Sequence, residues 1–337
     1  MTVKDVAEQV GVARSTAGHI LTGRGRELGI REETRTRVFE MARQLGYRPN
    51  ASARAMKKGC FDTIGFLATR FQEYLPVPLL RGTMEETARH RNKLLMTEVE
   101  RGNLGEPGTV PKLLRELSLD GVLTSFTYHQ PKAATDYMRE LRIPSVAINY
   151  KKDANAVYPD EFNGARAITT RLLDKGCRRI AYFDIITPGT VTHYSTIDRQ
   201  AGYRTAMQQA GIEPRIETRK VPWGLRKGGD DDPRLVSAQA LLTGDNPPEA
   251  VICSDPAAVG PLLRAAIERG MQIPRDIMIL VFHHESLSSL GWPVHCLKIP
   301  HEQCGRKAVG MLLNQIKNGE ESTPAAVIPY DFKDSGG

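Results

Sequence analysis

Polar side chains near the start of the chain share one face of an expected helix. No residue of this face is acidic: it consists of Arg14, Ser15, Gly18, His19 and Thr22. Arginine and histidine can donate hydrogen bonds to guanine, whereas a serine hydroxyl is less selective. The chemistry of this face is the recognition of base edges, and we predict that Arg14, Ser15 and His19 contact bases in DNA. Thr2 and Thr16 are also predicted to contact DNA.

Two short helices separated by a glycine are expected to hold this face, within VKDVAEQVGVARSTAGHIL. Thr2 can cap the first helix with Asp5 three residues on, and Gly11 has the backbone freedom for a sharp turn. A third helix is expected from about Arg31 to Leu45. These elements predict a helix-turn-helix domain, whose first helix braces the second against the major groove. The side chains expected to face inward are Val3, Val6, Ala7, Val10, Ala13, Ala17, Ile20, Leu21, Thr34, Val38, Met41, Ala42 and Leu45.

Gly18 is unexpected inside a helix, where it costs about 1 kcal/mol relative to alanine. A close approach to the phosphate backbone would explain it, and so would simple tolerance of a defect. The sequence leaves both interpretations open.

The net charge of +7 is concentrated at the start of the chain. Residues 1–60 contain 12 Lys and Arg against 6 Asp and Glu, whereas the other 277 residues contain 34 against 33. This distribution is typical of a nucleic-acid-binding module joined to a near-neutral body. A basic surface without a partner is the alternative that charge alone leaves open.

The composition, 40% hydrophobic and 25% charged over 337 residues, is that of an ordinary soluble chain. No apolar run reaches membrane length, and Met1 is followed by a charged amphipathic segment. We therefore expect a cytoplasmic protein with no membrane partner. The five cysteines are scattered and form no CxxC pair, which favours reduced, buried thiols over disulfides or zinc.

From Asp62 onward, short apolar strands alternate with helical patterns, which predicts βαβ units and parallel sheets. Helices are expected at residues 164–175, 200–210 and 257–269. Two sets of strands of similar size predict two α/β lobes rather than one long sheet. The expected strands are TIGFLA, KLLMTEV, DGVLTSF and IPSVAIN before about residue 159, and RRIAYFDI, EAVICS and IMILVF after it.

The sequence contains no Walker motif, no GxSxG and no metal-ligand spacing. We therefore expect no catalysis, no cofactor and no bound metal. The nearest cluster is FHHES at residues 282–286. Adjacent histidines on a strand point to opposite faces and would chelate poorly. A loop after a strand is nevertheless where α/β lobes contact ligands, so one of the two can line a pocket.

These segments together resemble the lactose/galactose-repressor (LacI/GalR) family of bacterial transcription regulators. The resemblance implies a helix-turn-helix domain with a hinge helix, followed by a two-lobed, periplasmic-binding-protein-like α/β domain that holds its ligand between the lobes. Three crossovers are expected near residues 158–161, 292–295 and 323–326. The match is weak from about Phe71 to Pro111. The segments that carry the resemblance are VKDVAEQVGVARSTAGHIL, REETRTRVFEMARQLGYRPNASARAM, EFNGARAITTRLLDKGCRRIAYF, DRQAGYRTAMQQAGI, EAVICSDPAAVGPLLRAAIERGMQIPRDIMILVF and GRKAVGMLLNQI.

The resemblance places the helix-turn-helix domain at residues 1–48, the hinge at 49–60 and an effector-binding and dimerisation domain at 61–337. Within the last, one lobe is expected at about 61–159 plus 295–323, and the other at about 160–292 plus 326–337.

In the family the hinge helix folds when two subunits meet over DNA, and an apolar side chain is wedged into a minor-groove base step. The matching residue is Met56, where the family usually has leucine. Arg54, Lys57 and Lys58 are expected at flanking phosphates, and Asn50 is expected to contact DNA as well. Taken alone, residues 50–58 could be a linker.

The sequence departs from the family pattern in its DNA-binding segment. Ala13 stands where a serine usually caps the recognition helix, a cap worth about 1 kcal/mol, and Gly18 stands where serine is common. The loop TGRGRELGI is longer than usual and carries Arg24 and Arg26, which can add phosphate contacts. These departures change which operator is expected, not the expectation of DNA binding.

Effector contacts are carried over from the family residue by residue. Arg199 matches an arginine that binds the hydroxyls or carboxylates of the effector in the family. The alternative, an arginine on the surface of a helix, is disfavoured by the motif around it. Asn149 and His283 stand where sugar-responsive members often have aspartate, and Ser254 stands where asparagine is common. Trp223 is either a stacking platform or a core or rim residue. The other residues predicted to line the site are Asp160 and Asp255.

The absence of two aspartates near Arg199 predicts a more positive site, which favours an anionic ligand such as a sugar acid or a phosphorylated sugar. The alternative is that a shifted loop supplies other carboxylates, from Glu285, Asp160 or Asp255.

The sequence thus predicts a homodimeric regulator, with repression favoured, that binds a pseudo-palindromic operator. Closure of the lobes on a small effector is expected to change the hinge-helix pairing and the operator affinity. A solute-binding receptor without DNA function is a first alternative, opposed by the basic module and the absent signal peptide. A sugar-processing α/β enzyme is a second, opposed by the lack of a phosphate loop and of a base–nucleophile pair.

Overall fold

The chain divides into two compact units, Met1–Phe61 and Asp62–Gly337. The computed structural model describes residues 1–47, 59–68, 75–99, 114, 118–126, 132–188, 192–222, 229–284, 291 and 294–332. Among these described residues, one hydrophobic cluster lies in the first unit and four lie in the second.

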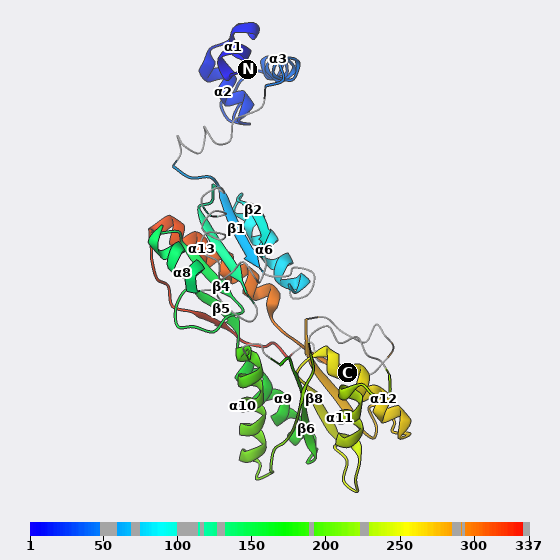
Figure 1. The fold of residues 1–337 in the computed structure, drawn as a ribbon. Helices are drawn as coiled ribbons and strands as arrows, with labels where there is room; N and C mark the ends of the chain where they lie inside the picture. The colour runs from blue at the N-terminus through cyan, green and yellow to red at the C-terminus, as the bar shows by residue number, and fades with distance from the viewer. Residues whose placement is uncertain are drawn as a thin grey trace. The chain divides into compact units, whose positions relative to one another are not determined.

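The described residues of the first unit form a bundle of three helices, α1 (Val3–Val10), α2 (Arg14–Leu21) and α3 (Glu32–Gln44) (Figure 1). The expected capping box begins α1: the Thr2 amide donates to Asp5 Oδ2 at 2.7 Å, and the Asp5 amide donates to Thr2 Oγ1 at 3.4 Å. Gly11 ends α1 with a φ of 73°, a left-handed conformation that glycine adopts without strain. The glycine turn therefore separates α1 from α2 as the sequence predicts.

The core of the first unit is formed by apolar side chains from one face of each of the three helices. Its fully buried members are Val6, Ala7, Val10, Ala17, Ile20, Val38 and Ala42. The expectation that Ala13 faces inward is wrong, since Ala13 is exposed and Val12 packs against the cluster instead. The reason is that Ala13 is the extended N-cap residue of α2 and lies outside the helical periodicity.

The first lobe of the second unit is built on a six-stranded sheet with the order β11-β5-β4-β3-β1-β2, in which every pair is parallel. Helices α6 (Val77–Arg89), α8 (Lys132–Glu140) and α13 (His301–Asn318) accompany it. The strands are β1 (Thr63–Ala68), β2 (Lys93–Glu98), β3 (Gly121–Ser125), β4 (Ser145–Ile148), β5 (Ala156–Pro159) and β11 (Ala326–Ile328).

The second lobe is built on a five-stranded parallel sheet with the order β10-β9-β8-β6-β7. Its strands are β6 (Ile180–Ile186), β7 (Arg215–Lys220), β8 (Ala250–Cys253), β9 (Met278–His283) and β10 (Val294–Lys298). Its helices are α9 (Glu161–Asp174), α10 (Tyr194–Gln209), α11 (Pro233–Leu242), α12 (Val259–Glu268) and the short 3-10 helix η2 (Pro256–Ala258). The predicted two-lobed α/β fold is confirmed.

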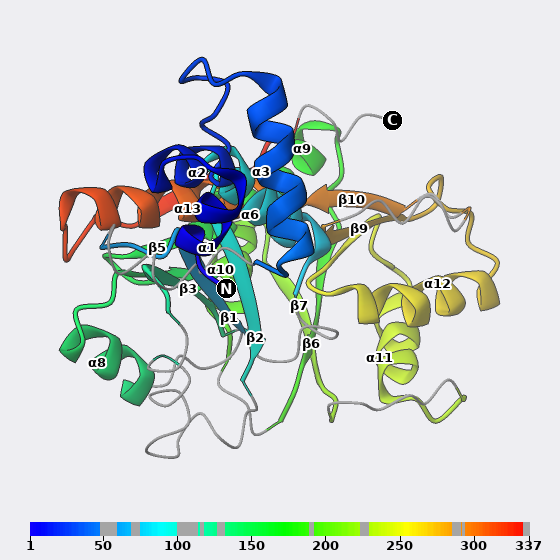
Figure 2. The same ribbon diagram turned by 90° about the horizontal axis from the view of Figure 1, so that it is seen from above.

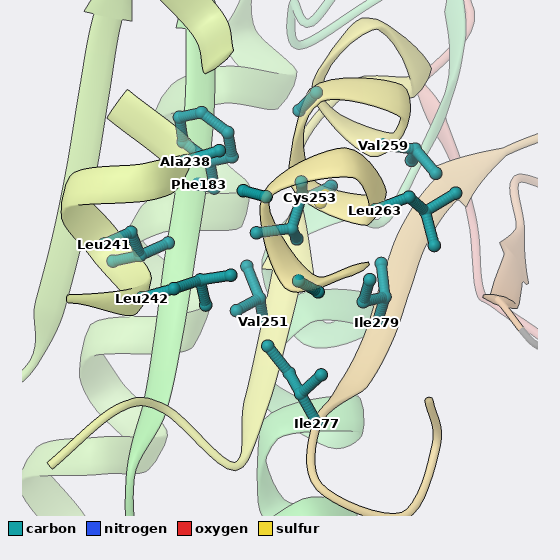
Figure 3. Close-up of a cluster of buried hydrophobic side chains, with 14 of the residues drawn as sticks. Phe183, Ala238, Leu241, Leu242, Val251, Cys253, Val259, Leu263, Ile277 and Ile279 are labelled. Carbon is teal, nitrogen blue, oxygen red and sulfur yellow. The ribbon is translucent and has the colours of Figure 1, made fainter. Parts of the chain in front are cut away.

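The α11 and α12 helices lie side by side against the second sheet (Figures 1 and 2). Figure 3 shows Leu241 and Leu242 of α11 and Leu263 of α12 meeting Val251 and Ile279 of the strands. Apolar side chains on both faces of each strand follow from parallel pairing, which buries a strand between layers of helices.

Within the described residues the chain crosses between the lobes three times, and two of these crossings differ from the prediction. β10 pairs with β9, so the second crossing follows Lys298 rather than residues 292–295. β11 pairs with β5, so the third follows Ile328 rather than residues 323–326. β10 therefore belongs to the second lobe and β11 to the first. These short strands are specified by hydrogen bonds to a sheet edge, which the local pattern of residues does not encode.

Glycines allow two helix pairs to approach closely, one pair in each lobe. A Cβ atom at Gly82 of α6 would lie 2.1 Å from the Glu302 carbonyl oxygen of α13. A Cβ atom at Gly202 of α10 would lie 2.2 Å from the Phe162 carbonyl oxygen of α9. The second contact matters for the ligand side of the molecule, because α9 carries Glu161 and α10 carries Arg199.

Candidate functional sites

The predicted DNA-reading face lies on α2. Arg14 and Ser15 are exposed in its first turn, and Thr16 and His19 are half-buried. Thr2 is committed to the capping box of α1, where its hydroxyl accepts from Asp5. Since α2 contains no Asp or Glu, phosphate groups near this surface would meet no like charge from it.

Gly18 is not required by the packing of the first unit. A Cβ atom there would meet only Val3 Cγ1, at an ordinary 3.9 Å. Packing within the protein therefore does not explain this glycine, and both interpretations remain: a close approach to the phosphate backbone, or simple tolerance.

The long loop after α2 has regular backbone hydrogen bonds. The Arg24 amide donates to the His19 carbonyl at 2.9 Å, and the Ile30 amide donates to the Gly25 carbonyl at 2.9 Å. Arg24 and Arg26 are exposed, and Arg24 Nε lies 4.0 Å from Glu27 Oε2. The loop therefore presents two guanidinium groups from a defined turn.

Several predicted residues lie outside the described part of the chain. They are Asn50, Arg54, Met56, Lys57 and Lys58 of the hinge, together with Trp223 and Glu285. Their roles stay predictions.

Arg199 is the centre of the candidate effector site. It is 7% exposed and donates from Nε and Nη2 to the two carboxylate oxygens of Glu161, at 2.6 and 2.9 Å. Nη1 donates to the Ser254 carbonyl at 2.9 Å. Burial lowers the pKa of Arg199, but the paired Glu161 carboxylate raises it and the net direction is upward. The guanidinium is therefore a fixed charge with a fixed counter-ion.

Two further groups complete the surroundings of this ion pair. The Arg199 Cζ atom lies 4.3 Å from the centre of the Phe282 ring, within range of a cation–π contact. The Tyr330 hydroxyl donates to Glu161 Oε2 at 2.5 Å. Because Glu161 was not considered in the prediction, the expected positive excess around Arg199 is wrong: the carboxylate comes from the first turn of α9.

A second carboxylate, Asp184, ends up beside Ser254 because β6 and β8 are neighbours in the sheet. Asp184 is fully buried, and its Oδ2 accepts from Gln200 Nε2 at 2.6 Å. Within the described residues, Asp184 Oδ1 and Ser254 Oγ have no hydrogen-bond partner other than each other. Burial raises the pKa of Asp184, and the nearby Ser254 hydroxyl and the Gln200 amide oppose this shift.

Asn149 lies where the first lobe meets α10. Its carbonyl oxygen is 3.0 Å from His193 Nε2, and its Oδ1 accepts from the Tyr194 hydroxyl at 3.2 Å. Since a carbonyl only accepts, Nε2 carries the histidine proton. Lys151 adds an ion pair, with Nζ 2.7 Å from Asp198 Oδ2. The start of α10 thus holds the loop after β4, and Arg199 follows directly on the same helix.

The two adjacent histidines do not point to opposite faces as expected. The ring centres of His283 and His284 are 4.1 Å apart. Strand alternation fails here because β9 ends at His283. His284 also lies 6.2 Å from His301, the first residue of α13. His301 is 6% exposed, and burial, followed by the charges of His284 and Arg199, lowers its pKa to about 3.

Asp160 and Asp255 serve as helix caps in this structure. Asp160 Oδ1 accepts from the Asn163 amide at 3.2 Å at the start of α9. Asp255 Oδ1 accepts from the Ala257 amide at 2.7 Å at the start of η2. Both carboxylates therefore have structural partners, and the carboxylates next to Arg199 and Ser254 are Glu161 and Asp184.

Sequence reasoning missed Glu161, Asp184, His193, Tyr194 and His301. One signal was present for Asp184, an acid inside the apolar run IAYFDII. Glu161 follows Asp160 at a helix start and resembles a solvent-facing pair of acids, so only the contact with α10 reveals its role.

Among the described residues, no group of three or more His, Cys, Asp or Glu side chains is placed to hold a metal ion. No helix in the same part of the chain is long and apolar enough to cross a membrane.

The helix-turn-helix unit and the two parallel-sheet lobes define a DNA-binding regulator with a ligand-binding body, and comparisons with known proteins agree. Residues 2–50 match the family described as bacterial regulatory proteins, lacI family, and residues 169–333 match a periplasmic binding protein-like domain. The chain thus joins a lacI-type DNA-binding region to a periplasmic-binding-protein-like domain. Its function is that of a DNA-binding transcription regulator.

Individual relatives extend over nearly the whole chain. The HTH-type transcriptional repressor PurR of Escherichia coli O1:K1 / APEC is 27% identical over 329 residues, which cover 95% of this chain and 92% of the relative. The structure of the lac repressor dimer bound to operator and the anti-inducer ONPF has a TM-score of 0.75 at 18% identity, and covers 98% of this chain and 96% of that one. The complex of the regulator CelR with cellobiose has a TM-score of 0.63 at 21% identity, over 98% of both chains.

Proposed function

We propose that this protein is a homodimeric repressor that binds a pseudo-palindromic operator and responds to a small effector. The observation that carries the proposal is the exposed, acid-free surface of α2, held in place by a capped α1. Two such surfaces related by a twofold axis read two half-sites of opposite orientation. A regulator that acts on chromosomal DNA works in the bacterial cytoplasm, and this role requires no catalysis.

The proposed dimer is supported by apolar side chains left exposed on the first lobe. Val77 and Met84 of α6 are 58% and 52% exposed, and Leu95 of β2 is 38% exposed. A second copy of this chain is the partner we propose for them. Sedimentation of the wild type and of a Met84→Asp variant tests this, because a buried aspartate would weaken the dimer. An unchanged dimer would place the interface elsewhere.

DNA recognition is tested by selecting bound duplexes from a random library with the full chain. The expected product is a sequence with inverted symmetry, bound by two subunits. Replacement of His19 by alanine should relax the preference at one base pair in each half-site. If the base preference of the His19→Ala variant is unchanged, His19 does not contribute to base recognition. If selection yields no enriched sequence, the proposal of operator binding fails.

The hinge proposal rests on the family resemblance alone. We propose that Met56 is the minor-groove wedge and that Asn50, Arg54 and Lys57 contact the flanking DNA. A Met56→Ala variant should dimerise normally and bend the selected operator less, measured by gel mobility of circularly permuted fragments. Equal bending by both proteins would contradict the wedge.

The effector is proposed to bind at the carboxyl ends of the strands of the second lobe, where parallel α/β sheets place their ligands. Arg199 and Ser254 lie together there, and α10 links them to Asn149 of the first lobe. A ligand that changes these contacts would change how the two lobes are held, and through them the operator affinity.

A further inference from the structure

The start of α10 joins the second lobe directly to the first. The Tyr194 hydroxyl donates to Asn149 Oδ1 at 3.2 Å, and the Tyr194 ring meets the Tyr158 ring edge-on, with centroids 5.6 Å apart. Asn149 follows β4 and Tyr158 lies on β5, so both belong to the first lobe. Burial raises the pKa of Tyr194, which keeps its hydroxyl protonated as the donor. One tyrosine side chain therefore makes both a polar and an aromatic contact with the other lobe.

His193 makes a second connection, and its geometry requires a single protonation state. Its Nε2 atom lies 3.0 Å from the Asn149 carbonyl oxygen, which only accepts, so Nε2 carries a proton. Its Nδ1 atom accepts from the Ser195 amide at 3.4 Å as the N-cap of α10, so Nδ1 carries none. Burial lowers the pKa of His193 to about 4, which agrees with a neutral ring. The same ring thus caps a helix of one lobe and binds the backbone of the other.

An ion pair adds a third connection, one turn further along α10. Lys151 Nζ lies 2.7 Å from Asp198 Oδ2, and the two side chains are 47% and 18% exposed. A partly exposed pair of this kind stabilises little by itself. Its two groups come from different lobes, however, so the pair forms only where the lobes meet.

The loop after β4 is shaped by these contacts with the second lobe. Asn149 has a φ of 58°, in the left-handed region that asparagine tolerates better than most residues. Both of its oxygen atoms accept from the start of α10. Sparsely populated backbone conformations persist where the surrounding structure determines them. The conformation of this loop therefore depends on closure of the lobes.

We infer that the start of α10 and the loop after β4 form a clasp, which holds the two lobes together in the absence of an effector. Every contact in it is direct, between atoms of the chain itself, so closure needs no ligand to bridge the lobes. The sequence predicts instead that the lobes close on an effector. The members of the clasp are His193, Tyr194 and Asp198 of α10 with Asn149, Lys151 and Tyr158 of the first lobe.

The clasp also sets the operator affinity of the effector-free chain. This part of the inference rests on the proposed function, in which the arrangement of the lobes governs operator binding. A change that opens the clasp should therefore change the operator affinity without any ligand.

The test is zero-length cross-linking of the full chain, dialysed and without added ligand. A carbodiimide joins a lysine amine to a carboxylate only where the two groups already touch, and mass spectrometry identifies the joined peptides. A Lys151–Asp198 cross-link should form in the wild type. The Lys4–Glu8 pair, 3.6 Å apart within α1, is the internal control for the reagent. Recovery of the Lys4–Glu8 cross-link without the Lys151–Asp198 cross-link would overturn the inference.

Two substitutions weaken the clasp and leave its ion pair in place as the reporter. Tyr194→Phe removes the hydroxyl and keeps the ring. His193→Asn keeps a side chain that caps helices and removes the Nε2 donor. In the double variant the yield of the Lys151–Asp198 cross-link should fall about tenfold, because two hydrogen bonds between the lobes are lost. If the double variant does not fold, Tyr194→Phe alone decides, with an expected fall of about threefold.

Thr205→Ala is the matched control on the same helix. It removes the hydrogen bond from Thr205 Oγ1 to the Ala201 carbonyl, 2.8 Å long and within α10, and should keep the wild-type yield. An unchanged yield in the folded clasp variant would contradict the inference, and so would an equal fall in Thr205→Ala.

Operator binding by the same preparations separates this inference from the proposed function. Without ligand, the clasp variant and the wild type should differ about fivefold or more in operator affinity. A lower cross-link yield with unchanged operator affinity would refute the link between the clasp and DNA binding. A chain that binds no operator would refute the proposed function, and the cross-link yields would still decide whether the clasp exists.

Discussion

Gly305 of α13 lies so close to Leu79 of α6 that a Cβ atom at this glycine would be 2.5 Å from the Leu79 carbonyl oxygen. The Thr83 amide nitrogen would be 2.8 Å away. Because both contacts are with backbone, no side chain can move aside. We expect Gly305→Ala to lower the free energy of unfolding by about 1–3 kcal/mol or more, measured by urea denaturation.

Gly310, on the same helix, is the matched control for this prediction. A Cβ atom there would have nothing within 4 Å. Gly310→Ala should therefore be neutral or stabilising by up to about 1 kcal/mol, because alanine is the better helix former. Equal effects of the two substitutions would show that helix propensity, rather than close packing, determines the result.

Ala13 leaves α2 without a side-chain cap. Its φ of −62° and ψ of 144° are those of an N-cap residue, and its side chain is exposed. Ala13→Ser should therefore stabilise the first unit by about 1 kcal/mol. Thermal unfolding of the full chain, followed by amide exchange in α2, measures the gain. Unchanged or faster exchange would mean that the added hydroxyl does not bond to the free helix end.

Arg24 and Arg26 should each contact a phosphate from the long loop after α2. Each contact that is lost reduces the slope of log K against log salt by about 0.9. The double variant Arg24→Gln/Arg26→Gln should therefore lower the slope by about 1.8 and leave the selected operator sequence unchanged. Arg275→Gln, an exposed arginine of the second lobe, is the control for charge removal. A slope equal to that of wild type would exclude phosphate contacts by the loop.

His301 should make the second unit lose stability in acid. Its pKa is lowered to about 3 by burial, whereas an unfolded histidine titrates near 6.5. Between these values the unfolded chain binds a proton that the folded chain does not, so stability is complete above about pH 6.5 and falls as the pH falls towards 3. The loss attributable to this group is roughly 5 kcal/mol at its limit.

The measurement is urea unfolding of wild type and His301→Leu across this range of pH. The variant should show a weaker pH dependence, because leucine does not titrate. Substitution of His90, the exposed C-cap residue that follows α6, should leave the dependence as in wild type. Parallel pH profiles of wild type and His301→Leu would contradict the prediction.

Much of the fold could be predicted because local patterns were strong. The apolar stripe of α1, the capping box of Thr2 and Asp5, and the turn at Gly11 are all encoded within a dozen residues. The strands at residues 63–68, 121–125 and 250–253 are short apolar runs, typical of buried parallel strands. By contrast, β7 is the charged sequence RIETRK at a sheet edge, where one side of the strand faces solvent and no apolar run is needed.

The sequence by itself determined the helix-turn-helix unit and the two α/β lobes, because each depends on spacing along a single segment, whereas Arg199 was singled out by the family resemblance. Only the tertiary structure decided which charges accompany Arg199. Glu161 is 38 residues away along the chain and meets it because Gly202 lets α9 and α10 approach closely. Ser254 stands beside Asp184 because β8 pairs with β6. The interaction between two charges depends on the distance between them in space. Helix packing and strand order set that distance for residues that are far apart along the chain.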